Sequence, residues 1–167
     1  EERPNGVHSR LNEAMYFWED YDQEDLDTPL NYWNDCYKGI AQANKALELL
    51  STYPKSARVK ALYGEAFLLR AYLHFMLVNI WAQPYSNQTT DPGIPYITKP
   101  EKEALVDYKR QTVNEVYEMI EKDLKRGITL VDDEYYKHPK FHFNKKAAYA
   151  FASRFYLMKG DWEQVVA

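Results

Sequence analysis

An aromatic and acidic stretch near the N-terminus carries the residue types with the clearest chemistry in this sequence. It reads "YFWEDYDQEDLDTPLNYW" and sets Trp18, Tyr21 and Trp33 beside Asp20 and Asp22. An aromatic ring packs against the C–H face of a sugar, and carboxylates accept hydrogen bonds from its hydroxyl groups. We therefore predict these five residues as ligand-binding residues. The alternative is that Trp18 packs on the first helix and that the acids are solvated.

Two groups of potential metal ligands do not form a recognisable site. The acids of the same stretch alternate as in an EF-hand loop, but Asp25 and Asn31 stand where that loop needs its glycine and its bidentate glutamate. His138 and His142 are four residues apart, yet Pro139 lies between them and interrupts a regular helix. We predict no metal and no other cofactor.

Several function classes have no support in the sequence. It contains no GxSxG motif, no P-loop and no HExxH motif, and no pair of carboxylates stands out as a glycosidase pair. The chain holds many carboxylates, however, so counting alone leaves a glycosidase pair open. The net charge is −4 with acidic and basic residues mixed along the chain, which argues against a nucleic-acid partner. Cys36 is the only cysteine, so the chain cannot form an internal disulfide.

Helical patterns must position these residues. Thr28 and Pro29 open one helix as cap and first residue, and Thr112 with Glu115 forms a capping box for another. Gly127 is predicted to end that second helix, and Asn144 and Gly160 are predicted to cap and to end a later one. Asn44 lies on the apolar face of the first helix, where we expect its side chain to bond a neighbouring backbone group and fix the helix pairing, in preference to contacting a ligand. The expected helices run over about 29–50, 56–82, 110–127 and 144–160, with a further helix starting at Asp161 and a short one before Trp18. No strand pair is evident, and the expected fold class is all-α.

The helix expected over 56–82 is apolar on nearly every side, as "EAFLLRAYLHFMLVNIWAQP" shows. Glu65, Arg70, His74 and Asn79 interrupt it too often for a membrane span, so we interpret it as a buried central helix whose charged residues have partners. A long connection rich in proline follows from Pro84 and is expected to be functional or packed as a loop of its own.

The C-terminal helices resemble a tetratricopeptide repeat. Tyr149, Ala152, Ser153 and Tyr156 match its spacing, with Ser153 leaving room for a close helix crossing. Tyr149, Tyr156 and Trp162 are expected to fill the space between the paired helices. We therefore predict antiparallel helix pairs in a right-handed stack. Because the final helix is so short, we also expect residues 1–167 to be one helical region from the N-terminal part of a longer protein.

Four blocks in sequence order resemble the SusD/RagB family of outer-membrane nutrient-binding lipoproteins. One block, "GEAFLLRAYLHFMLVNIWAQPY", is similar to the family's Glu-Ala-x-Phe-Leu-Arg-Ala-Tyr helix, with Leu68 in place of the phenylalanine. Another pairs "GIPYITKP" with the helix that begins "RQTVNEVYEMI". The first and last blocks are "YWNDCYKGIAQANKALELL" and "NKKAAYAFASRFYLMKGDWEQVVA".

The resemblance implies a non-catalytic function at the bacterial cell surface. Such proteins bind an oligosaccharide or a peptide and deliver it to a TonB-dependent, SusC-like transporter. The resemblance also implies a lipid anchor on a cysteine upstream of this chain. A rival hypothesis is an intracellular tetratricopeptide adaptor that binds other proteins, and a weaker one is a carbohydrate-active enzyme on a helical scaffold.

Overall fold

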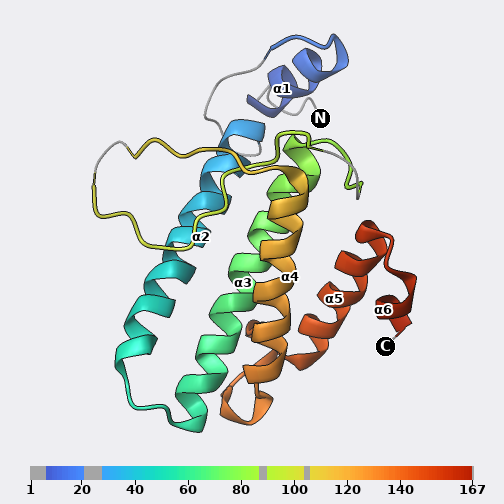
Figure 1. Cartoon of the computed structure of the whole chain (residues 1–167). Helices are drawn as coiled ribbons and strands as arrows, with labels where there is room; N and C mark the ends of the chain where they lie inside the picture. The colour runs from blue at the N-terminus through green and yellow to red at the C-terminus, as the bar shows by residue number, and fades with distance from the viewer. Residues whose placement is uncertain (1–6, 21–27, 87–89, 104–105, 167) are drawn as a thin grey trace, which may run out of the picture. The chain divides into compact units, whose positions relative to one another are not determined.

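The structure is a computed structural model that describes residues 7–20, 28–86, 90–103 and 106–166. All of its named elements are helices, which confirms the all-α prediction for the described residues. Figure 1 shows the arrangement of these elements. The α-helices are α1 (Val7–Tyr16), α2 (Pro29–Thr52), α3 (Ala57–Trp81), α4 (Val113–Leu130), α5 (Lys145–Lys159) and α6 (Trp162–Val166), and the two 3₁₀ helices are η1 (Asp133–Tyr135) and η2 (Pro139–Phe141).

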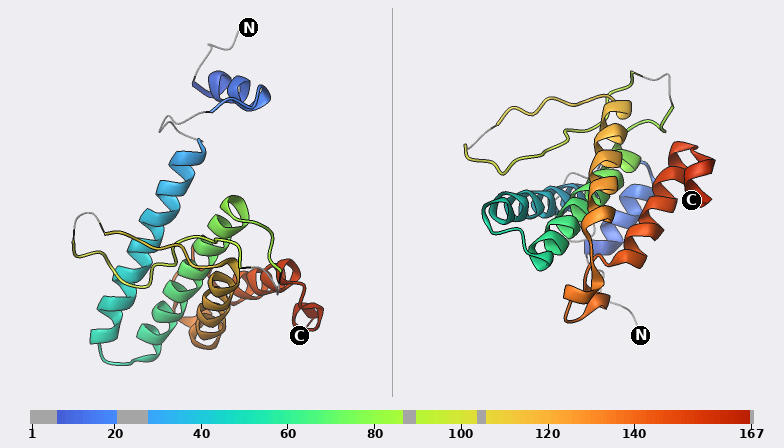
Figure 2. Two further views of the ribbon diagram at one scale, coloured as in Figure 1. Left: turned by 45° about the horizontal axis from the view of Figure 1, so that its top comes forward. Right: turned by 60° about the horizontal axis from the view of Figure 1, so that its bottom comes forward.

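The chain forms two compact units, residues 1–38 and 39–167. The first unit contains α1 and the beginning of α2, and α2 continues into the second unit. In the second unit α3 and α4 run antiparallel and pack along their length, and α5 packs on α4 (Figures 1 and 2). Neighbouring helices therefore alternate in direction, as the predicted helix pairs require.

The central position of α3 explains its composition. By length and composition α3 could cross a membrane, with a mean hydropathy of 1.2 over its apolar window, but 61% of that window is buried inside the protein. Ser56 caps its first turn by accepting a hydrogen bond from the Val59 N–H. Its buried charged residue Arg70 has a protein partner, as described below. These observations confirm a central core helix.

Gly127 does not end its helix as predicted, because α4 continues to Leu130. A Cβ at Gly127 would lie 2.9 Å from the Gly64 carbonyl oxygen, and one at Gly64 would lie 2.9 Å from the Gly127 carbonyl oxygen. The two glycines therefore mark a close approach between α3 and α4. Gly160 does end α5, with a φ of 77° that glycine tolerates best.

The space between α5 and α6 is filled differently from the prediction. Tyr149 and Trp162 are 60% and 66% exposed, and only Tyr156 of the three predicted aromatics is buried. The reason is that α5 directs Phe151 and Phe155 into the core, which leaves Tyr149 on the solvent side. Ser153 lies at the crossing, with its Oγ 3.5 Å from the Val165 carbonyl oxygen.

Candidate functional site

The last residue of α1 and the two residues after it are aromatic and exposed to solvent. Tyr16, Phe17 and Trp18 are 78%, 61% and 95% exposed, and the rings of Tyr16 and Phe17 meet edge to face at 5.0 Å. Trp18 has a φ of 58°, a left-handed conformation that is uncommon for a bulky residue. Asp20, two residues further on, is also exposed. The Trp18 ring is therefore available to a ligand and does not pack on α1.

The other residues predicted for this site have different surroundings. Trp33 lies in the first turns of α2, is half-buried, and packs against Tyr37 with 4.9 Å between ring centroids. Tyr21 and Asp22 lie outside the described residues. The structure thus gives an exposed position to Trp18 and Asp20 and a partly covered one to Trp33.

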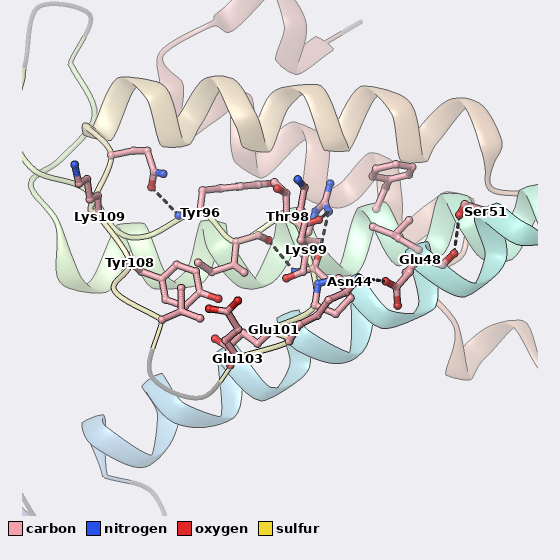
Figure 3. A pocket seen from close by; sticks show the side chains of 18 of the residues that line it. Asn44, Glu48, Ser51, Tyr96, Thr98, Lys99, Glu101, Glu103, Tyr108 and Lys109 are labelled. Carbon is pink, nitrogen blue, oxygen red and sulfur yellow. Dashed lines mark hydrogen bonds and ion pairs between the residues drawn. The ribbon is translucent and has the colours of Figure 1, made fainter.

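The second unit contains a groove of about 910 Å³ that the sequence reasoning missed (Figure 3). One wall is a face of α2 with Asn44, Leu47, Glu48 and Ser51, whose spacing of three and four residues places them in a row. The opposite wall consists of loop residues 96–103, 106–109 and 111, and the floor comes from α3 and α4. We call this feature the α2–loop groove. The sequence signals for it were the row on α2 and the long proline-containing connection.

A buried ion pair supports the floor of the α2–loop groove. The Arg70 guanidinium donates two hydrogen bonds to the Asp123 carboxylate, with Nε–Oδ2 and Nη2–Oδ1 distances of 2.7 and 2.8 Å. Burial alone would lower the pKa of Arg70, but Asp123 more than offsets that effect and raises it. The Tyr96 hydroxyl donates to Asp123 Oδ2 at 2.6 Å, and burial beside this carboxylate raises the pKa of Tyr96 well above its usual value. The network keeps all three side chains ordered.

The same network holds the inner part of the loop against the helices. Arg70 donates to Asn44 Oδ1 at 2.8 Å and to the Thr98 carbonyl oxygen at 3.2 Å. The Asn44 amide donates to the Ile97 carbonyl oxygen at 3.0 Å. Asn44 therefore bonds a neighbouring backbone segment, as predicted from its place on an apolar helix face. The base of the loop is closed by a Gly93 N–H that donates to the Gln111 carbonyl oxygen at 2.7 Å.

His74 joins this network as a neutral ring. Its Nδ1 lies 2.8 Å from the Arg70 carbonyl oxygen, and its Nε2 accepts a hydrogen bond from the Ile97 N–H at 3.0 Å. These partners assign the proton to Nδ1, since a backbone carbonyl can only accept. The ring also stacks on Tyr96 at 3.8 Å. Burial, together with the nearby Arg70 charge, lowers the pKa of His74 to about 3.

This low pKa predicts a stability that falls in acid. In the unfolded chain His74 has a pKa near 6.5, so it binds a proton at a pH where the buried ring of the folded protein stays neutral. The contribution of His74 to the free energy of unfolding is therefore fully present above about pH 6.5 and is lost as the pH falls toward 3. Between pH 7 and pH 5 the loss from His74 should be about 2 kcal/mol. Urea unfolding at both pH values, in the original chain and in His74→Gln, measures it. An equal pH dependence in the two proteins would contradict the assignment.

The two histidines that were considered as metal ligands have other roles. His142 Nδ1 lies 3.0 Å from Glu65 Oε2, and its ring stacks on Tyr136 at 4.3 Å. The Phe143 N–H donates to the same Glu65 carboxylate at 2.9 Å. His138 meets Phe141 edge to face. Within the part of the chain that the structure describes, no group of three or more metal-ligating side chains gathers.

Comparisons with known proteins place this fold. A family model for SusD-like proteins, described as starch-binding and associating with the outer membrane, matches residues 1–157. A SusD superfamily protein from Bacteroides thetaiotaomicron shares 22% identity with a TM-score of 0.71, and the match covers 87% of this chain and 35% of that one. A putative sugar-binding protein from Bacteroides vulgatus shares 25% with a TM-score of 0.71, covering 83% and 31%.

A laminarin-binding SusD-like protein is similar as well, with 28% identity, a TM-score of 0.65, and coverage of 82% of this chain and 28% of that chain. No curated protein matches. The chain spans about a third of the length of these solved structures. The family match extends over nearly the whole sequence and agrees with the fold and with the motifs of α2, α3 and α5. The chain therefore belongs to the SusD-like family.

Proposed function

We propose that this protein captures a carbohydrate at the bacterial outer membrane, leaves it chemically unchanged, and delivers it to a TonB-dependent, SusC-like transporter. The observation that carries the proposal is the exposed Trp18 ring in a chain whose family is described as starch-binding. A ring that is 95% exposed leaves nearly all of its apolar surface in water, and a partner that covers the ring removes that surface from water. A sugar face is a suitable partner.

The proposed contacts are those predicted from the sequence. Trp18 and Trp33 would provide ring faces, and Asp20 and Asp22 would accept hydrogen bonds from hydroxyl groups. Tyr21 would add a ring with a polar edge. The unusual backbone conformation of Trp18 supports this assignment, because such residues cluster at functional sites.

The proposed setting includes a lipid anchor at the cell surface, attached to a cysteine upstream of this chain. The family description, which associates these proteins with the outer membrane, supports the location. The gene should then encode a signal peptide followed directly by such a cysteine, which stays on the mature protein after cleavage. Family membership favours this setting over an intracellular tetratricopeptide adaptor. A peptide ligand is an alternative to the carbohydrate and belongs in the same binding screen.

Replacing Trp18 by Ala is expected to weaken polysaccharide binding by at least tenfold. Removal of a central exposed ring from a binding site commonly costs more than 1 kcal/mol, and tenfold corresponds to 1.4 kcal/mol. Affinity gel electrophoresis with starch and laminarin measures retention of the full chain, and product analysis tests for cleavage. Peptides are screened in parallel by calorimetry.

The matched control is Trp162→Ala, which removes an exposed indole from the second unit. This variant should bind as the original chain does. Equal binding by Trp18→Ala and Trp162→Ala would remove Trp18 from the site, and release of shorter sugars would identify an enzyme instead of a binding protein.

A further inference from the structure

We propose that the α2–loop groove is a second binding site for neutral oligosaccharides, separate from the aromatic segment of the first unit. This inference rests on the proposed function and adds a site to it. The groove lies entirely within residues 44–126, so it belongs to the second unit alone. Its volume of about 910 Å³ is near the upper end of the roughly 300–1,000 Å³ of known ligand pockets. That size suits several linked sugar units.

The charges that line the groove favour a neutral ligand. Arg70 at the floor is already neutralised by Asp123. The remaining charged side chains are balanced in number, so the groove has no excess charge with which to attract a polyanion or a polycation. Each of them can still bond a hydroxyl group, since carboxylates accept and ammonium or guanidinium groups donate. The acidic residues are Glu48, Glu101, Glu103 and Asp107, and the basic residues are Lys99, Lys102, Lys109 and Arg126.

Aromatic rings at the groove provide the apolar contact that a sugar face needs. Tyr108 on the loop is 37% exposed, and its hydroxyl points toward the Glu101 carboxylate (Figure 3). Tyr63 on the floor is half-buried, and the Arg126 guanidinium lies 5.6 Å from its ring centroid. Rings beside hydrogen-bonding groups therefore lie on the loop wall and on the floor of the groove, and sugar recognition uses this combination.

The walls are held in place before any ligand arrives. The bonds of Asn44 to the Ile97 carbonyl and of the Tyr96 N–H to Gln111 Oε1, at 3.0 and 2.7 Å, fix the inner loop. Lys102 on the loop lies 3.7 Å from Glu48 across the groove. A ligand therefore does not have to order the inner wall, and less binding free energy is lost.

Calorimetric titration of the full chain with maltoheptaose and with laminarihexaose tests the proposal. We expect two binding sites for at least one of these sugars in the original chain, and one in Trp18→Ala. Adding Tyr108→Ala to Trp18→Ala should weaken the remaining site by at least tenfold. Arg126→Gln provides a second, independent change in the groove, and it should also weaken that site. Thermal unfolding followed by circular dichroism confirms that each variant is folded.

Tyr135→Ala is the matched control, because Tyr135 is 38% exposed and lies outside the groove. It should leave both sites intact. If Trp18→Ala alone removes all binding, the second site is overturned while the proposed function stands. Binding that survives in Trp18→Ala combined with Tyr108→Ala and with Arg126→Gln also overturns the groove. If the original chain binds neither these sugars nor starch nor laminarin, the proposed function is overturned together with the second site.

Discussion

Replacing Asp123 by Asn is expected to lower the free energy of unfolding by about 3–5 kcal/mol. Both side chains of the Arg70–Asp123 pair are less than a tenth exposed, so the change leaves a guanidinium charge buried without its counter-charge. The Tyr96 hydroxyl also loses its carboxylate acceptor. Urea unfolding followed by circular dichroism at pH 7 measures the effect.

The matched control is Asp35→Asn, which makes the same chemical change in an exposed pair. Asp35 lies 3.0 Å from Lys38, and their side chains are 57% and 69% exposed. Because solvent screens such exposed pairs, they contribute little net stabilisation, and Asp35→Asn should change the free energy of unfolding by no more than about 0.5 kcal/mol. If Asp123→Asn and Asp35→Asn lower the free energy of unfolding equally, the buried pair does not stabilise the second unit.

A second consequence of Asp123→Asn concerns the loop. Because Arg70 also bonds Asn44 and the Thr98 carbonyl oxygen, loss of its partner should loosen residues 94–99. Amide hydrogen exchange should then speed up at Ile97, whose N–H is bonded to His74. The Arg70–Asp123 pair thus links the stability of the core to the shape of the α2–loop groove. The Asp123→Asn variant should have both a lower free energy of unfolding and a less ordered groove wall.

The helices were predictable because their signals are local. The capping box of Thr112 and Glu115 and the cap of Asn144 each depend on residues a few positions apart, and the structure contains both. The apolar circumference of α3 predicted a helix covered on several sides. Asn44 was assigned a backbone partner from its place on an apolar face, since a buried amide needs one.

Local patterns do not predict the hydrogen-bond network or the groove, because the residues that form them are distant in sequence. Arg70 and Asp123 are 53 positions apart, and each is one of many charged residues that a pattern cannot pair. The floor of the groove depends on how closely α3 approaches α4, which is set by Gly64 and Gly127, and in the sequence Gly127 looks like an ordinary helix end. Gly127 was assigned as such an end for this reason.

The same limit applies to the aromatics. Spacing correctly placed Tyr149, Tyr156 and Trp162 on helices, but only the packing of α5 on its neighbours decides which ring is buried. In the first unit, composition indicated a binding segment, and the 95% exposure of Trp18 is consistent with it. The contact with a ligand remains a prediction for the binding experiments.

Replacing Gly64 by Ala should lower the free energy of unfolding by about 3 kcal/mol, at the upper end of the usual range for overpacking. The new Cβ would lie 2.7 Å from the Val131 backbone nitrogen and 2.9 Å from the Gly127 carbonyl oxygen. Backbone atoms cannot swing aside, so α3 and α4 must separate along the interface that carries most of the core. Urea unfolding measures the change.

Gly39→Ala is the matched control, because Gly39 also lies inside a helix and faces a close neighbour. There the new Cβ would meet Leu73 Cδ1 at 2.8 Å, which is the tip of a flexible side chain that can change rotamer. Alanine favours a helix over glycine by up to about 1 kcal/mol, so this variant should be neutral or slightly more stable. If the two variants behave alike, the separation of α3 and α4 is set by side chains elsewhere. If Gly64→Ala lowers the free energy of unfolding and Gly39→Ala raises it, backbone contact at Gly64 sets the separation of α3 and α4 under the groove.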